Sequence, residues 1–431
     1  MKIQRRAARG AAAALAILAY GGAGPKAALA ADGAVLTAPA NRADAALRAY
    51  WTPERLASAQ PLDVVTANTF EPGDAVAPAA GPTSVVPGAS PSAPYDDTLA
   101  EQLYIPSGRD ELQTAAVGPN PPRYPYAIDR LYPCSGSGCP TSSSSYSNVW
   151  AFYPNEIVGH LYFTIGTSGF VCSASVIRRS VIATAGHCVS DGKRHFYNNW
   201  LFVPAEHGGL GPFGKWGWTQ VVVTGPWFNG GGTVPNKQDD ALIVLAANSS
   251  RQKIGNVTGY LGYEYNAPLP THVSQLGYPC VLDGCIDPIR DDSQVYLGPN
   301  NNFEWGSAAF RGASGGPAIQ DFGQQPSHPS GTPPFEAFGG NILISSFSYF
   351  HTDTNVQVDG GSILAARGQF GGTLNTFGDL IKFVCATQAT AERRGALPVA
   401  PARDGERLFQ AFFQAYLPRP EPTAGRGRYP S

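Results

Sequence analysis

A glycine-rich turn around Ser314 constrains this chain more than any other stretch. Residues 312–317 read Gly-Ala-Ser-Gly-Gly-Pro. A serine hydroxyl is a poor nucleophile at neutral pH, so it needs a base beside it and backbone N–H donors for the oxyanion that it creates. The glycines let the backbone turn sharply and leave its N–H groups open to an incoming carbonyl. Alone, the stretch also fits an ordinary Gly/Ser turn.

A second motif lies upstream, at residues 181–188. It reads Val-Ile-Ala-Thr-Ala-Gly-His-Cys, so an apolar run delivers His187 at its end and Cys188 follows at once. Histidine is the side chain that most often serves as a general base. The two motifs together predict that folding brings a nucleophile and a base to one place.

Thr-Ala-Gly-His-Cys followed by Gly-x-Ser-Gly-Gly-Pro resembles the chymotrypsin-like (trypsin-like) serine peptidases, and the pattern is closest to the bacterial and fungal glutamyl-endopeptidase-like members. The resemblance covers residues 148–388, roughly. It implies an all-β fold of two antiparallel six-stranded barrels, at about 158–268 and 269–376, with a closing helix from Phe377 to Gln388.

The resemblance also implies a catalytic triad in the chain order His, Asp, Ser. His187 would be the base and Ser314 the nucleophile, with N–H groups of Gly312 and Ser314 as the oxyanion hole. Two aspartates, Asp239 and Asp240, open the apolar run that ends at residue 245. The family pattern Asp-x-Ala selects Asp239 as the acid, and Asp240 stays the alternative.

Three residues are expected to contact substrate: Ala308, Ser348 and Tyr349. Ala308 stands where trypsin-type members carry an aspartate, so a preference for Lys or Arg is not expected, and glutamyl specificity stays open by analogy. Ser348 and Tyr349 end a stretch, 338–349, that resembles the strand pairing with substrate backbone. Ala313 replaces the aspartate that receives a new N-terminus in animal digestive members, so any activation must work differently.

The chain has seven cysteines, and most cysteines of an exported protein should pair. The resemblance implies a disulfide between Cys172 and Cys188. The pairing of the other five stays open; they are Cys134, Cys139, Cys280, Cys285 and Cys385. No Cys-x-x-Cys pair occurs, so neither a metal site nor a cofactor is expected.

The N-terminus predicts export. Four basic residues precede a short apolar run at 11–20, and Ala28-Leu29-Ala30 fits the rule for signal-peptide cleavage. We therefore expect a signal peptide at 1–30, a secreted or periplasmic protein, and no integral membrane segment in the mature form.

A propeptide-like region is expected at 31–133, before a peptidase domain at 134–388 and a tail at 389–431. Residues 43–56 can form a helix, and the pattern at 50–63 resembles the propeptide that precedes glutamyl-endopeptidase-like enzymes. Residues 71–94 are rich in Pro and Ala and are expected to be a disordered linker. The region is a candidate inhibitor of its own enzyme.

Composition restricts the partners. The formal net charge is -2 and only 14% of residues are charged, so nucleic acid is not an expected partner; protein or peptide substrates are. The acidic pair Asp291-Asp292 is interpreted as a solvated loop and not as a calcium site. Two other functions stay open: an inactive homologue that acts as a binding protein, and an esterase-type serine hydrolase, whose α/β fold would place the nucleophile before the histidine.

Overall fold

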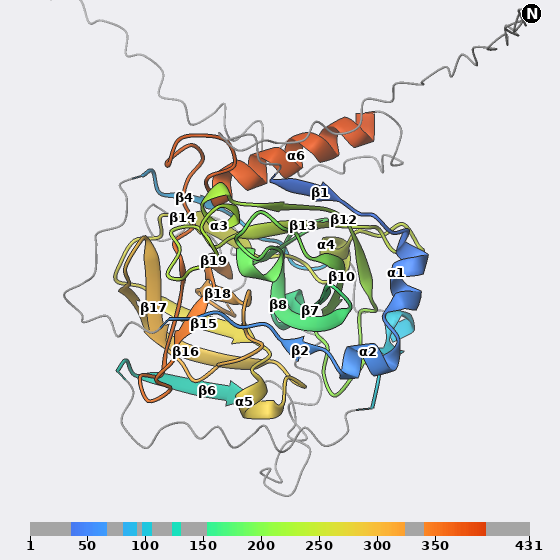
Figure 1. Cartoon of the computed structure of the whole chain (residues 1–431), viewed down its shortest axis with the longest axis horizontal. Helices are drawn as coiled ribbons and strands as arrows, with labels where there is room; N and C mark the ends of the chain where they lie inside the picture. The colour runs from blue at the N-terminus through green and yellow to red at the C-terminus, as the bar shows by residue number, and fades with distance from the viewer. Residues whose placement is uncertain are drawn as a thin grey trace, which may run out of the picture.

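The computed structural model describes residues 36–66, 81–92, 97–105, 123–130, 153–323 and 340–393 (Figure 1). Several sequence predictions lie outside these residues: the signal peptide, Cys134 and Cys139, and the tail beyond residue 393. Most described elements are strands, which confirms the all-β class.

The first sheet closes into a six-stranded barrel. Its hydrogen-bonded order is β12-β10-β7-β8-β9-β13, and β13 pairs back with β12. Every one of these pairings is antiparallel. The strands are β7 (Val158–Ile165), β8 (Ser168–Arg178), β9 (Val181–Thr184), β10 (Asn198–Pro204), β12 (Trp216–Val223) and β13 (Ala241–Leu245).

The second sheet has eleven strands in the order β3-β20-β21-β17-β16-β15-β18-β19-β14-β4, with β6 beside β16. Its strands from the body of the chain are β14 (Gly262–Tyr265), β15 (His272–Gly277), β16 (Ile289–Leu297), β17 (Asn302–Gly306), β18 (Pro317–Gln320), β19 (Ile342–Ser346), β20 (Tyr349–His351) and β21 (Val358–Ser362). The strand expected at 338–349 is thus two strands, β19 and β20, separated by Phe347 and Ser348.

Buried apolar side chains fill the first barrel and the space between the sheets. Bulky β-branched and aromatic residues on β7, β8, β12 and β13 are almost completely inaccessible, which is the pattern of strands that are covered on both faces. A smaller cluster fills the second sheet around Phe303 and Trp305. The two cores hold the facing ends of the sheets in place, and the candidate site lies between them.

Short elements connect the strands. They are β11 (Leu210–Gly211), α3 (Gly225–Phe228), α4 (Ile254–Val257), α5 (Cys280–Asp283), and the 3-10 turns Asn155–Ile157 and Gly186–Cys188. The last helix, α6 (Phe377–Arg393), lies across the outer side of β12 and β13 (Figure 1). It is the expected closing helix, with more residues at its C-terminal end.

The N-terminal region contributes short strands to both sheets. In the first sheet β1 (Thr37–Pro39) pairs with β12, and β2 (Gln60–Pro61) pairs with β8. In the second sheet β3 (Val65–Thr66), β4 (Ser84–Val86) and β6 (Tyr126–Arg130) pair with β20, β14 and β16. A further turn, Asp97–Leu99, leads to β5 (Glu101–Gln102), which pairs with β11.

Two sequence predictions for this region are corrected. The helix expected at 43–56 is two helices, α1 (Asp44–Tyr50) and α2 (Pro53–Ala57), because Pro53 begins a new helix behind the N-cap Thr52. The linker expected to be disordered at 71–94 is ordered at 81–92, where β4 pairs with β14; its other residues lie outside the described part.

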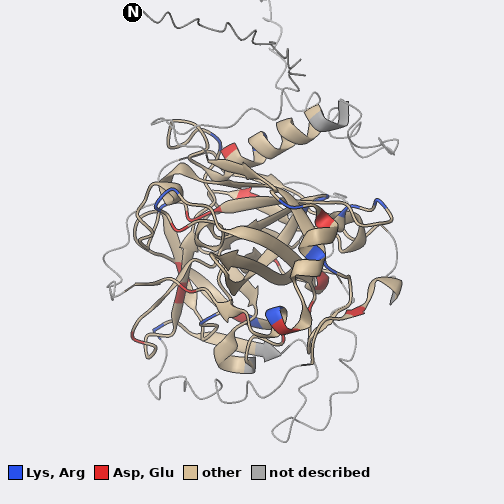
Figure 2. Ribbon diagram, turned by 45° about the vertical axis from the view of Figure 1, so that its right-hand side comes forward, with Lys and Arg blue, Asp and Glu red and all other residues tan. Residues whose placement is uncertain are grey.

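Charged positions are few and scattered along the described ribbon (Figure 2). The pair Asp291-Asp292 does not form a solvated loop: it lies inside β16, where alternate side chains are buried, and Asp291 is 1% exposed. Among the described residues, no helix is long and apolar enough to cross a membrane.

Candidate active site

His187 follows β9 in the 3-10 turn Gly186–Cys188 and is buried. The turn fits closely against Trp227, because a Cβ on Gly186 would lie 2.7 Å from the indole and 2.8 Å from a carboxylate oxygen of Asp239. The Trp227 ring meets the imidazole edge-on, with centroids 5.9 Å apart. Only glycine at position 186 allows the histidine to sit this near its acid.

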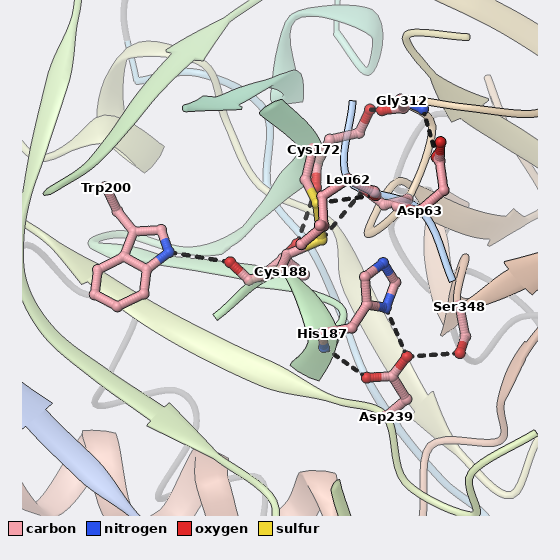
Figure 3. Close-up of a disulfide and its surroundings, with 12 residues drawn as sticks. Leu62, Asp63, Cys172, His187, Cys188, Trp200, Asp239, Gly312 and Ser348 are labelled. Carbon is pink, nitrogen blue, oxygen red and sulfur yellow. Dashed lines mark hydrogen bonds and ion pairs between the residues drawn. A yellow bond between two sulfur atoms is a disulfide. The ribbon is translucent and has the colours of Figure 1, made fainter. Parts of the chain in front are cut away.

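Asp239 is the acid that contacts the imidazole. One carboxylate oxygen accepts the backbone N–H of His187 at 2.8 Å, and the other lies 2.8 Å from Nδ1 of the same residue. The Ser348 hydroxyl donates to that second oxygen at 2.6 Å. The Asp239 N–H in turn donates to the Ser362 hydroxyl at 2.8 Å. Figure 3 shows the contacts of Asp239 with His187 and Ser348.

Asp240 lies next to Asp239 in the chain but faces other surroundings. It is 1% exposed, and neither of its carboxylate oxygens has a hydrogen-bond partner among the described residues. Burial, and then the neighbouring charge of Asp239, raise the pKa of Asp240 well above its usual range. The geometry therefore distinguishes the two candidate acids: Asp239 contacts His187, and Asp240 does not.

The turn that carries Ser314 adopts backbone angles that require glycine. Gly312 has φ +95° and Gly315 has φ +79°, values that side-chain-bearing residues rarely adopt. A Cβ on Gly312 would lie 2.6 Å from the Tyr278 carbonyl oxygen, and one on Gly315 would lie 2.4 Å from the Ser173 carbonyl oxygen. The glycines that marked this stretch in the sequence are thus needed both for the turn and for close packing.

Ser173 on β8 holds the turn against the first sheet. Its hydroxyl donates to the Gly312 carbonyl at 2.9 Å and accepts the Tyr278 N–H at 3.1 Å. Its backbone N–H donates to the Ser314 carbonyl at 2.7 Å. The turn from one sheet is therefore fixed beside the histidine from the other.

The structure contains the Cys172–Cys188 disulfide, and Cys188 Sγ lies 3.7 Å from the Ser314 carbonyl oxygen. The two sulfurs and His187 lie near enough to share a metal ion, but sulfurs joined in a disulfide are not thiolate ligands. A second disulfide joins Cys280 to Cys285, beside Gly312, and Cys385 is a free cysteine.

Ser314 Oγ and His187 Nε2 are both buried, and neither has a hydrogen-bond partner among the described residues. Catalytic hydrogen bonds are often long in a resting enzyme and tighten only with substrate. The structure therefore has no hydrogen bond between the Ser314 hydroxyl and the His187 imidazole.

Asp63 from the N-terminal region lies at the same place. One of its carboxylate oxygens accepts the Gly312 N–H at 3.0 Å (Figure 3). Burial raises the pKa of this carboxyl, whereas the Gly312 hydrogen bond and the charges of Arg311 and His187 act in the opposite direction. A donor that was expected to serve the oxyanion is thus occupied by a side chain of the same chain.

The residues expected to contact substrate have other partners here. Ala308 is buried, and its N–H points to Asp291 Oδ2 at 3.3 Å. The Ser348 hydroxyl bonds to Asp239, and the Tyr349 hydroxyl donates to Glu304 Oε1 at 3.1 Å. Contact between these residues and a substrate stays a prediction.

Sequence reasoning missed Asp63, Ser173 and the hydrogen bond from Ser348 to Asp239. Ser173 lies in the strand before the histidine motif, and Asp63 lies at the end of the propeptide-like pattern. Nothing in either stretch says which distant backbone group the side chain will meet.

The chain was compared with known proteins. No protein-family model matches it. Among curated proteins it is similar to the glutamyl endopeptidase of Bacillus licheniformis, with 25% identity over 185 residues, which are 42% of this chain and 52% of that protein. The sequence similarity agrees with the resemblance of the motifs to the glutamyl-endopeptidase-like serine peptidases. It spans about half the length of the curated relative that it matches.

Two solved structures are also similar to this chain. One is the protease Anisep from Arthrobacter nicotinovorans, with 24% identity and a TM-score of 0.42, covering 50% of this chain and 94% of that one. The other is a Glu endopeptidase in complex with MPD, with 18% identity and a TM-score of 0.40, covering 55% of this chain and 92% of that one.

Proposed function

We propose that this chain is an exported serine endopeptidase that cleaves peptide bonds through Ser314, His187 and Asp239. The observation that carries the proposal is the buried pair of His187 Nδ1 and Asp239 at 2.8 Å, in a turn whose disulfide contacts the Ser314 backbone. A carboxylate with three donors around it stabilises a positive imidazole and fixes its tautomer.

In this proposal His187 takes the Ser314 proton as the hydroxyl attacks a peptide carbonyl, and then protonates the leaving amine. The N–H groups of Gly312 and Ser314 stabilise the oxyanion, each contributing roughly 2.7–4 kcal/mol in the transition state. Water then hydrolyses the acyl-enzyme by the reverse sequence. Asp239 orients the base throughout and keeps its charge.

We also propose that the N-terminal region inhibits the enzyme until it is removed. Its residues 60–66, called the strap below, pair with β8 of the first sheet and β20 of the second. A tethered segment has a high effective concentration at its own site, so it competes well with a free substrate. The exported zymogen would mature by cleavage after the strap, outside the barrels.

The test is covalent labelling and digestion. The chain is freed of its N-terminal region by a metalloprotease and gel filtration, and is treated with a fluorophosphonate probe and with casein. We expect probe on Ser314 and casein cleavage, and loss of both in Ser314→Ala. The control Ser346→Ala, at a buried hydroxyl on β19 that the proposal does not use, should keep both. A protein that takes up no probe at Ser314 would be the inactive binding homologue.

A further inference from the structure

The strap crosses the candidate site from one sheet to the other. In its first half Gln60 and Pro61 pair in parallel with β8, and the Leu62 N–H donates to the Val171 carbonyl at 3.1 Å. In its second half Val65 and Thr66 pair in parallel with β20. The strap is therefore held by backbone hydrogen bonds on both sides of the Ser314 turn.

Between these two pairings the strap presents a side chain to the site, and not its backbone. The group hydrogen-bonded to the Gly312 N–H is the Asp63 carboxyl. The charged groups that face it are Arg311 on the same turn, His187 on the first sheet and Asp359 on β21. Two of these three attract an anion when they are charged, so the turn has the donor and the charges of a carboxyl site.

We propose that Gly312, with Arg311 and His187, forms a carboxyl-binding site, and that Asp63 fills it and so makes the strap an inhibitor and not a substrate. The proposal rests on the proposed function, because it concerns the same oxyanion donor. Peptide cleavage needs a backbone carbonyl at that donor. Attack of Ser314 on a side-chain carboxyl would expel only water or hydroxide and would cut no peptide bond. The strap can therefore stay docked beside an assembled triad and remain whole.

A competing explanation is that backbone pairing alone holds the strap in place. The two explanations differ in what the removal of one side chain does. If pairing suffices, the loss of the Asp63 carboxyl changes nothing. If the carboxyl fills the site, its loss frees the Gly312 N–H, weakens docking, and lets a strap carbonyl reach Ser314.

The experiment uses the full chain, purified uncut. Four forms are compared: the wild type, Asp63→Ala, Asp63→Ala combined with Ser314→Ala, and the control Glu54→Gln. The control removes a fully exposed negative charge from helix α2, which lies before the strap in the N-terminal region. Each uncut form is treated with the fluorophosphonate probe, and a wild-type sample freed of its N-terminal region gives the uninhibited rate.

We expect uncut Asp63→Ala to react about tenfold faster than uncut wild type, the factor that the loss of one buried hydrogen bond gives. Glu54→Gln should react like the wild type. Mass spectrometry should find new cuts within the strap of Asp63→Ala, and none when Ser314→Ala is added. If uncut Asp63→Ala reacts as slowly as the wild type while the freed wild type reacts fast, the inference is wrong. If the freed wild type does not react at all, the proposed function fails instead.

A pH series separates a carboxyl from a side chain that merely fills space. Because the pKa of docked Asp63 is raised, the docked strap holds a proton more tightly than the free one. Docking should therefore weaken as pH rises from the ordinary carboxyl range through the raised pKa. The ratio of freed to uncut labelling rates should fall as pH rises above the ordinary carboxyl range, about pH 4, in the wild type, and stay flat in Asp63→Asn. A flat ratio in the wild type would contradict the inference.

Discussion

Asp239 beside His187 and Asp359 inside the second sheet are equally buried, but their hydrogen-bond partners differ. Asp239 is 0% exposed and accepts hydrogen bonds from His187 and Ser348. Asp359 on β21 is also 0% exposed, yet neither of its oxygens has a partner of good hydrogen-bond geometry among the described residues. Burial raises the pKa of Asp359 well above its usual range, although Ser307 and Gln275 lie near enough to oppose the shift.

This comparison teaches that donors, and not depth, decide what a buried aspartate can do. A buried carboxylate surrounded by donors stays available as a charged partner for a base. A buried carboxyl without donors is stabilised as the neutral acid, because the charged form would lose its water and gain nothing. The first kind is suited to orient a histidine, and the second is suited only to fill the wall of a sheet.

The largest effect is expected at Asp239. Asp239→Asn keeps the shape but removes the charge and favours the wrong imidazole tautomer, so kcat should fall by about 10⁴. Asp240→Asn is the matched control, one residue away and equally buried, and should leave kcat within a few-fold of the wild type. The measurement is kcat on a peptide substrate after removal of the N-terminal region. A large loss in Asp240→Asn alone would mean that the acid was assigned to the wrong neighbour.

The next effect concerns Ser348, which was predicted from the sequence to contact substrate. Its hydroxyl donates to Asp239 at 2.6 Å, and one such bond to a charged group is worth a factor of roughly ten or more in rate. Ser348→Ala should therefore lower kcat about tenfold and leave KM nearly unchanged. A rise in KM with constant kcat would show that the hydroxyl serves the substrate and not Asp239.

A third prediction concerns stability and Asp291 on β16. Burial raises the pKa of Asp291 to about 7, against the hydrogen bonds from Ser307 and Ala308. Between about pH 4 and 7 the folded state holds the proton more tightly than the unfolded state, so the free energy of unfolding should fall as pH rises through this window. The loss due to Asp291 should be on the order of a few kcal/mol, and Asp291→Asn should make the slope less steep, leaving the part due to Asp240 and Asp359.

Thermal unfolding in a pH series measures this effect. Asp353→Asn is the control, because that aspartate lies on an exposed turn. The same pH slope in Asp291→Asn as in the wild type would mean that another group takes up the proton.

The smallest effect is expected at Asp359. An acid that is already neutral at pH 7 can be replaced by the neutral amide at little cost, so Asp359→Asn should shift Tm by only about 2 °C or less. Calorimetry at pH 7 measures the shift. A large fall in Tm would show that Asp359 is charged and paired, which would remove the contrast with Asp239.

The strands and the turn that local sequence patterns determine were predicted from the sequence. The apolar runs that end at His187 and begin at Ala241 formed strands, and the glycines at 312 and 315 formed the turn that their positions required. The position of the strap could not be predicted from local patterns, because Asp63 and Gly312 are 249 residues apart in the chain. Contacts at such a distance depend on the finished fold of both sheets, which no local periodicity describes.

The error at Asp291-Asp292 has a different source. Two adjacent aspartates suggest a solvated loop by composition, but β16 alternates between buried and less buried positions, so Asp291 is buried and Asp292 is only half-buried. The flanking residues carried this alternation. The interpretation relied on the polarity of the two aspartates, whereas the alternation along β16 determines where their side chains lie.

The strap also has a consequence for the order of events during biosynthesis. Its partners lie on β8, on the Ser314 turn and on β20, so the segment that a ribosome makes early can be placed only after much later segments have emerged and paired. Closing loops of this length is slow compared with forming neighbouring strands. A newly made chain therefore passes through an interval in which the triad can assemble while the strap is still outside. Under the proposed function the site is uncovered during that interval, because the strap can inhibit the enzyme only after both sheets have formed.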